Sequence, residues 1–131
     1  MSVAGTIGRE ASNAVIKSNS DSKAADQLDE LVLEMNRDLP RFLDAETRLD
    51  KVHREHKTLV SSHTIVNYKS NEVDPSLIEQ NVKETTKGNV CETARLYLQG
   101  GYSYRYIYYG NLGSKITEIS LNARDCGFTV R

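Results

Sequence analysis

The side chains that could carry out acid–base or metal chemistry are concentrated in one stretch of the sequence. They are His53, His56 and His63, with the carboxylates Asp44, Glu46 and Asp50 before them and the hydroxyls of Ser61 and Ser62 close by. Zinc needs three or four ligands in fixed geometry, and this spacing matches no familiar zinc motif. The serines lack the strand-to-helix elbow that exposes a nucleophile. We therefore expect surface histidines on a turn, carboxylates that cap or pair locally, as Asp44 with Arg48, and no enzyme activity, metal or cofactor.

A second set of candidate residues lies in a tyrosine-rich stretch of high β propensity. Tyr102, Tyr104, Tyr106 and Tyr108 alternate with other residues, so a strand places their rings on one face and Arg105 on the other. The rings either form an exposed strip that binds a partner, with Arg105 beside it, or pair across strands under the helices as core residues. Both alternatives stay open at this point.

The two cysteines, Cys91 and Cys126, can form a disulfide or remain as two buried thiols. A bridge between them closes a loop of about 36 residues and stabilises the fold by about 4 kcal/mol in the chain-entropy model. It also indicates an oxidising compartment. The first residues lack the apolar centre of a signal peptide, so location in an oxidising compartment requires a leader or anchor that this chain does not show.

Composition excludes several classes of partner. The chain has 131 residues, a net charge of −1, 27% charged residues and 38% hydrophobic residues. Such a nearly neutral chain has no field to attract nucleic acid or anionic lipid. No apolar run approaches the roughly 20 residues that span a bilayer. We expect no nucleic-acid partner, and membrane contact only through a missing N-terminal anchor.

The order of helical and strand patterns predicts one α+β domain over residues 21–131, preceded by a tether or frayed helix over residues 1–20. A first helix follows Ser20 and ends near Asp38. Two strands then cover 47–53 and 58–68, joined through 54–57. Two helices run from Pro75 to Gly88 and from Val90 to Gly100, and a final hairpin turns at Gly110–Gly113. The order α-β-β-α-α-β-β favours helices on one face of an antiparallel four-stranded sheet.

Several short motifs together resemble a group of small bacterial proteins that are mostly uncharacterised. The motifs are Leu39-Pro40, Asp44, Thr47-Arg48-Leu49-Asp50, the tyrosine strand and Asp125-Cys126-Gly127-Phe128. The resemblance implies association with the cell envelope, a leader or membrane segment before the domain, and a disulfide between Cys91 and Cys126. It carries no catalytic residues.

Three functional hypotheses follow. The favoured one is a non-enzymatic, protein-binding module of the bacterial cell envelope, located in the periplasm, or in the cytoplasm if no leader exists. The alternative is a toxin-neutralising, immunity-type protein whose acidic helix face would meet a basic toxin; that face carries Asp26, Asp29, Glu30 and Glu34. The third is an enzyme in which His53 or His63 converges with a carboxylate. A homodimer through the strand edge at Thr47–His53 is a further expectation.

Overall fold

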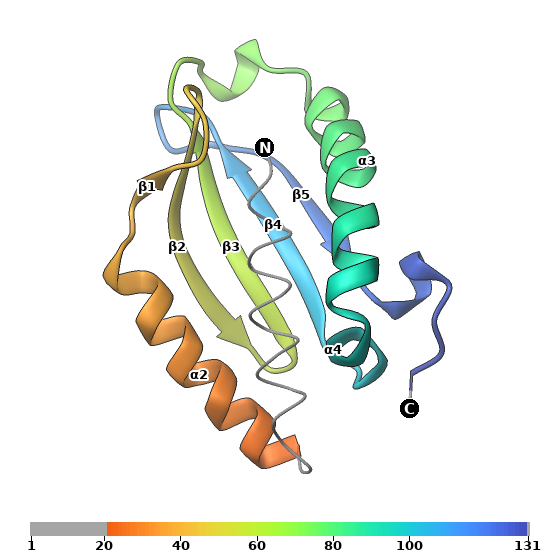
Figure 1. Cartoon of the computed structure of the whole chain (residues 1–131). Coiled ribbons are helices and arrows are strands. Elements are labelled where there is room, and N and C mark those ends of the chain that lie inside the picture. The colour runs from red at the N-terminus through yellow and green to blue at the C-terminus, as the bar shows by residue number, and fades with distance from the viewer. Residues whose placement is uncertain (1–20, 131) are drawn as a thin grey trace.

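The computed structural model describes residues 21–130, and the tether expected over residues 1–20 lies outside them. A five-stranded sheet in the order β1-β2-β3-β4-β5 carries the fold, with the long helices α2 beside β2 and α3 beside β5 (Figure 1). The elements are α2 (Asp21–Arg37), β1 (Arg41–Phe42), β2 (Thr47–Glu55), β3 (Thr58–Ile65), the 3-10 helix η1 (Ser70–Glu72), α3 (Pro75–Thr93), α4 (Arg95–Gln99), β4 (Ser103–Tyr109), β5 (Lys115–Leu121) and the 3-10 helix η2 (Ala123–Cys126).

The α+β class is confirmed, but the antiparallel four-stranded sheet is wrong. The two predicted hairpins, β2–β3 and β4–β5, are antiparallel, whereas β3 and β4 pair in parallel. The physical reason is the crossover between them. Because α3 and α4 return the chain to the end of the sheet where β3 began, β4 must run in the same direction as β3.

Two further differences concern short-range signals. The two-residue strand β1 was not among the predicted strands, and it exists because Arg41 and Phe42 pair with Leu49 and Arg48 of β2. Helix α3 was expected to stop at Gly88, but it continues to Thr93. A glycine costs a helix only about 1 kcal/mol, which the burial of Val90 in the next turn offsets. The start of α3 is as expected, since Asp74 caps the helix and accepts from the Ser76 backbone N–H.

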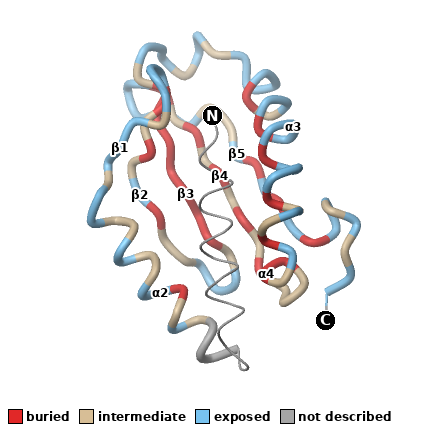
Figure 2. The backbone as a smooth tube through the Cα atoms, in the orientation of Figure 1, coloured by how far each residue is buried: buried red, intermediate tan, exposed pale blue. Residues whose placement is uncertain are grey.

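One hydrophobic core lies between the helices and the inner face of the sheet. Helix α2 contributes the buried Leu28, and α3 contributes Ile78, Val82 and Val90. The buried residues run along β3 and β4, in the middle of the sheet (Figure 2). Among the described residues, no helix combines the length and apolar character that crossing a bilayer requires.

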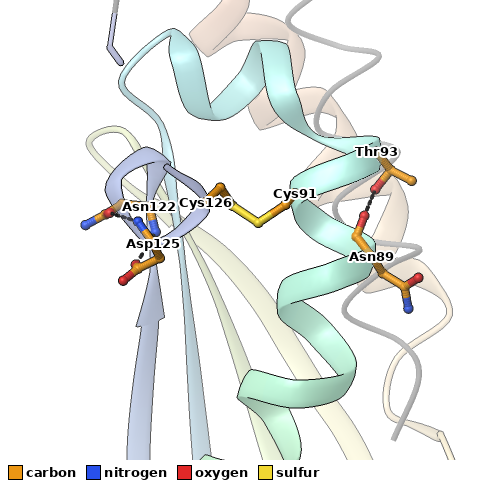
Figure 3. The surroundings of a disulfide bond; sticks show 6 residues. All are labelled: Asn89, Cys91, Thr93, Asn122, Asp125 and Cys126. Atoms are coloured by element: carbon orange, nitrogen blue, oxygen red, sulfur yellow. Dashed lines mark hydrogen bonds between the residues drawn. A yellow bond between two sulfur atoms is a disulfide. The ribbon is translucent and has the colours of Figure 1, made fainter. Parts of the chain in front are cut away.

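The predicted disulfide is present. Cys91 of α3 is bonded to Cys126 of η2, with 5.6 Å between their Cα atoms (Figure 3). Asn122 and Asp125 cap the short helix η2 reciprocally, side chain to backbone, so the segment that holds Cys126 is fixed locally as well. The bridge therefore joins the last turns of α3 to the chain that leaves β5.

Candidate functional site

Tyr104, Tyr106 and Tyr108 share the inner face of β4, and Tyr102 lies just before this strand. Tyr102, Tyr104, Tyr106 and Tyr108 are 3%, 1%, 1% and 4% exposed. The ring of Tyr104 lies 4.8 Å from that of Tyr97 and stacks on Tyr106. An exposed strip made of these rings is therefore wrong, because all four rings belong to the hydrophobic core. The rings are core residues, the alternative that was left open.

Arg105 lies on the outer face of the sheet in a row of alternating charges. Its guanidinium is 2.8 Å from Glu55 Oε2 and 3.8 Å from Glu118 Oε1. His53 also contacts Glu55, and Lys115 pairs with Glu118. Hydrogen bonds from His53 and then Arg105 hold the pKa of Glu55 below its usual value. Arg105 is thus matched by neighbouring carboxylates within its own sheet.

The three histidines do not converge. His53 is half-buried on the outer face, and His56 occupies the β2–β3 turn at φ 54°. His63 is 2% exposed on the inner face, where its ring lies 4.6 Å from that of Tyr108. The expected surface placement is therefore wrong for His63, because β3 is the central strand. No group of three His, Cys, Asp or Glu in the described part of the chain could hold a metal ion.

His63 is held in its neutral form. Burial lowers its pKa to about 4, against a smaller upward effect from Asp50. Neither ring nitrogen has a hydrogen-bond partner in residues 21–130, and the Ser61 hydroxyl on the same strand is also unpartnered. A general base needs a positioned partner within hydrogen-bond reach. His63 thus forms no histidine–carboxylate pair with another residue of 21–130.

The acidic residues serve local roles. Arg48 pairs with Asp50 at 2.5 Å, not with Asp44 as expected. Asp44 instead accepts from the backbone N–H groups of Glu46 and Thr47, each at 2.8 Å. A pocket of about 340 Å³ beside it has an acidic rim, but Asp74 and Asp44 at that rim are already caps of their own turns.

One carboxylate on the acidic side of α2, that of Asp29, contacts the sheet. Asp29 accepts from Arg54 of β2 in a bidentate pair, at 2.7 and 2.9 Å. The hydrogen bond from Arg54 is the main reason that the pKa of Asp29 is lowered. This carboxylate therefore joins α2 to the sheet.

The structure reveals one groove that sequence reasoning missed, which we name the α3–β5 groove. It encloses about 220 Å³ and is lined by Val82, Lys83, Thr86, Lys87, Tyr106, Ile119, Ser120, Leu121 and Asp125. The apolar side chains and the Tyr106 ring form its floor, and the exposed Lys83 and Lys87 stand on α3 at its rim. The groove thus combines an apolar base with a basic edge.

Tyr106 lines this groove with part of its side chain, and its hydroxyl is fully buried without a hydrogen-bond partner in residues 21–130. Burial raises the pKa of Tyr106 well above its ordinary value, so the group remains a neutral O–H that can donate. A buried hydroxyl without a partner costs about 1–3 kcal/mol. The only sequence signal for this groove is the four-residue spacing of Lys83 and Lys87, which places both on one helix face.

Comparisons with known proteins identify the fold. No protein-family model matches the chain, and no curated protein matches its sequence. A Pseudomonas aeruginosa protein provisionally described as secreted superposes with a TM-score of 0.65 at 14% identity, over 83% of this chain and 97% of that one. The pilotin EpsS of the Vibrio vulnificus type 2 secretion system superposes with a TM-score of 0.58 at 16% sequence identity, over 75% of this chain and 86% of that one. The type II secretion pilotin AspS of Vibrio cholerae superposes with a TM-score of 0.53 at 15% sequence identity, over 75% of this chain and 87% of that one. At these identities the match establishes a shared fold.

Proposed function

We propose that this chain is a non-enzymatic, protein-binding module of the bacterial cell envelope, and that the α3–β5 groove is its binding site. The observation that carries the proposal is an apolar groove, lined by Val82, Ile119 and Leu121 and rimmed by the exposed Lys83 and Lys87. Such a combination of apolar surface and a few polar anchors suits recognition. The separated histidines supply no competing catalytic arrangement in residues 21–130.

The location and class rest on two supports. The disulfide between Cys91 and Cys126 favours an oxidising compartment such as the periplasm. The fold is shared with two type II secretion pilotins and with a protein described as secreted. By analogy we propose a partner among envelope proteins. The toxin-neutralising alternative has no comparable support, and its residue Asp29 is engaged by Arg54.

Site-specific photo-crosslinking in the native host tests this function. A photoreactive benzoylphenylalanine is placed at Lys83 or Lys87 on the groove rim and, as a control, at the exposed Lys51 of β2. We expect ultraviolet light to join the two groove variants, but not the Lys51 variant, to an envelope protein identified by mass spectrometry. The adduct should weaken when Thr86 is replaced by a bulkier residue. Equal crosslinking at all three positions, or none at the groove with the protein folded and oxidised, contradicts the proposal.

A further inference from the structure

The two edges of the sheet differ in how they are closed. At one edge β1 pairs with Leu49 and Arg48 of β2. Further along β2, the Asn36 side chain of α2 donates to the Val52 carbonyl at 2.7 Å and accepts from the Val52 N–H at 2.9 Å. These contacts replace a neighbouring strand, so the homodimer expected through Thr47–His53 meets an edge that is already occupied.

The other edge, strand β5, is open. Its seven residues pair with β4 on one side only. No backbone group of Lys115–Leu121 bonds to a turn, a loop or a side chain elsewhere in residues 21–130. Since alternate residues of an edge strand turn their N–H and C=O groups outward, β5 presents a row of donors and acceptors that have no partner within residues 21–130.

The open edge and the α3–β5 groove adjoin. Ile119 and Leu121 direct their side chains to the inner face with Tyr106, so Ser120 between them points to the outer face. Ser120 nevertheless lines the groove, which means that the groove reaches the main chain of β5. Helix α3 runs alongside this strand (Figure 1), and its lysines stand on the groove side.

We infer, on the basis of the proposed function, that the partner docks by adding an extended strand to the free edge of β5. Its side chains on the groove side are acidic and meet Lys83 and Lys87. Residues four apart on a helix stand roughly 6 Å apart, and residues two apart on a strand stand about 6.5 Å apart. Two carboxylates at alternate positions of the added strand therefore match both lysines.

The charge at the groove decides between occupants. Asp125 is the one carboxylate among the groove's lining residues, and it is bonded to the Asn122 backbone N–H. The rim is therefore net basic, which favours an acidic strand and disfavours a basic one. Main-chain hydrogen bonds would provide affinity, and the alternate acidic side chains would provide selectivity, as in other cases of strand addition.

Peptide binding with hydrogen exchange tests the mode of docking. The probe is a short peptide of alternating glutamate and valine. Its controls are the lysine and valine counterpart and a glutamate peptide whose backbone is N-methylated at alternate residues. We expect the glutamate peptide to bind about tenfold more tightly than the lysine peptide, and the N-methylated peptide to lose binding. Amides of β5 should gain protection on binding. The double change Lys83→Glu with Lys87→Glu should reverse the charge preference, whereas Lys51→Glu should not.

The outcomes separate this inference from the proposed function. Equal affinity for the glutamate and lysine peptides, or protection confined to α3, overturns strand addition. Protection of β5 that rises with protein concentration without peptide overturns it too, by making a second copy the occupant. In each case groove-specific photo-crosslinking to an envelope protein would leave the proposed function standing. Peptide binding without any such crosslink would instead remove the function.

Discussion

The side chain of Asn36 pairs with the backbone of Val52 as a neighbouring strand would. Its amide nitrogen donates to the Val52 carbonyl and also to the Val32 carbonyl of its own helix, at 2.7 and 2.9 Å. Its amide oxygen accepts from the Val52 N–H at 2.9 Å. The contact falls where the pairing of β2 with β3 shifts register between Leu49 and Lys51. One side chain thus joins α2 to the sheet and closes the edge beside a bulge.

Replacing Asn36 with alanine should lower the free energy of unfolding by about 2 kcal/mol, because both backbone groups of Val52 lose their partner. Chemical denaturation measures the change. Asn89→Ala is the matched control, since that amide contacts only the Thr85 carbonyl within its own helix, at 3.2 Å. The control should change stability by less than about 0.5 kcal/mol. Similar values for both variants would show that the pairing with Val52 contributes nothing.

The stability of the protein should fall in mild acid because of His63. Its folded pKa of about 4 lies below the ordinary value of 6.5, so the unfolded chain takes up a proton first as the pH falls. The stabilisation is complete above about pH 6.5 and is lost as the pH falls toward 4, by about 3 kcal/mol. Urea titrations of the wild type and His63→Phe across this range should diverge by that amount.

The control for this titration is His56→Asn, which keeps a residue that tolerates the positive φ of the β2–β3 turn. This variant should show the same loss in acid as the wild type. Parallel curves for the wild type and His63→Phe would contradict the assignment, since carboxylates with lowered pKa values, such as Asp29, would then account for all acid sensitivity.

Two glycines should respond in opposite directions to alanine. A Cβ on Gly110 would lie 2.3 Å from the Ser70 backbone nitrogen and 2.8 Å from the Lys69 carbonyl carbon, so Gly110→Ala should destabilise by about 2 to 4 kcal/mol. Gly88 has nothing within 4 Å of that position and sits inside α3. Gly88→Ala should therefore stabilise by about 1 kcal/mol. Thermal unfolding of both variants checks the signs. No loss in Gly110→Ala would argue against the close approach at Gly110, and a loss in Gly88→Ala would contradict the open space at Gly88.

Removal of the disulfide should cost about 4 kcal/mol in the chain-entropy model for a bridge of this sequence separation, 35 residues. The double variant Cys91→Ala with Cys126→Ala should show faster hydrogen exchange at η2 and the residues that follow. Reductant should lower the melting temperature of the wild type and leave that of the double variant unchanged. An equal response of both proteins to reductant would mean that the bridge does not stabilise the fold.

Local patterns predicted the elements better than their arrangement. Alternation placed Tyr104 and Tyr106 on one face of a strand, and the Asp74-Pro75 pair marked the start of a helix. Alternation cannot say which face the helices cover, so the rings could be expected at the surface as well as in the core. The parallel pairing of β3 with β4 depends on where the crossover returns the chain, and no residue of either strand encodes that direction alone.

The α3–β5 groove was beyond sequence reasoning for a related reason. Its walls come from α3, β4, β5 and η2, and only the final packing brings Lys83, Tyr106 and Leu121 together. His63 was misplaced because a histidine within a β-branched run looks the same in an edge strand and in a central one. Its burial follows from β3 having neighbours on both sides.

The bond between Cys91 and Cys126 has a consequence for the groove itself. It links α3, which carries the lysine rim, to the segment that follows β5, which forms the opposite wall. The spacing of the two walls is therefore set covalently at one end before any partner arrives, so little conformational freedom is left to lose on association. A reducing environment would remove the bridge and, with it, this covalent constraint on the width of the groove.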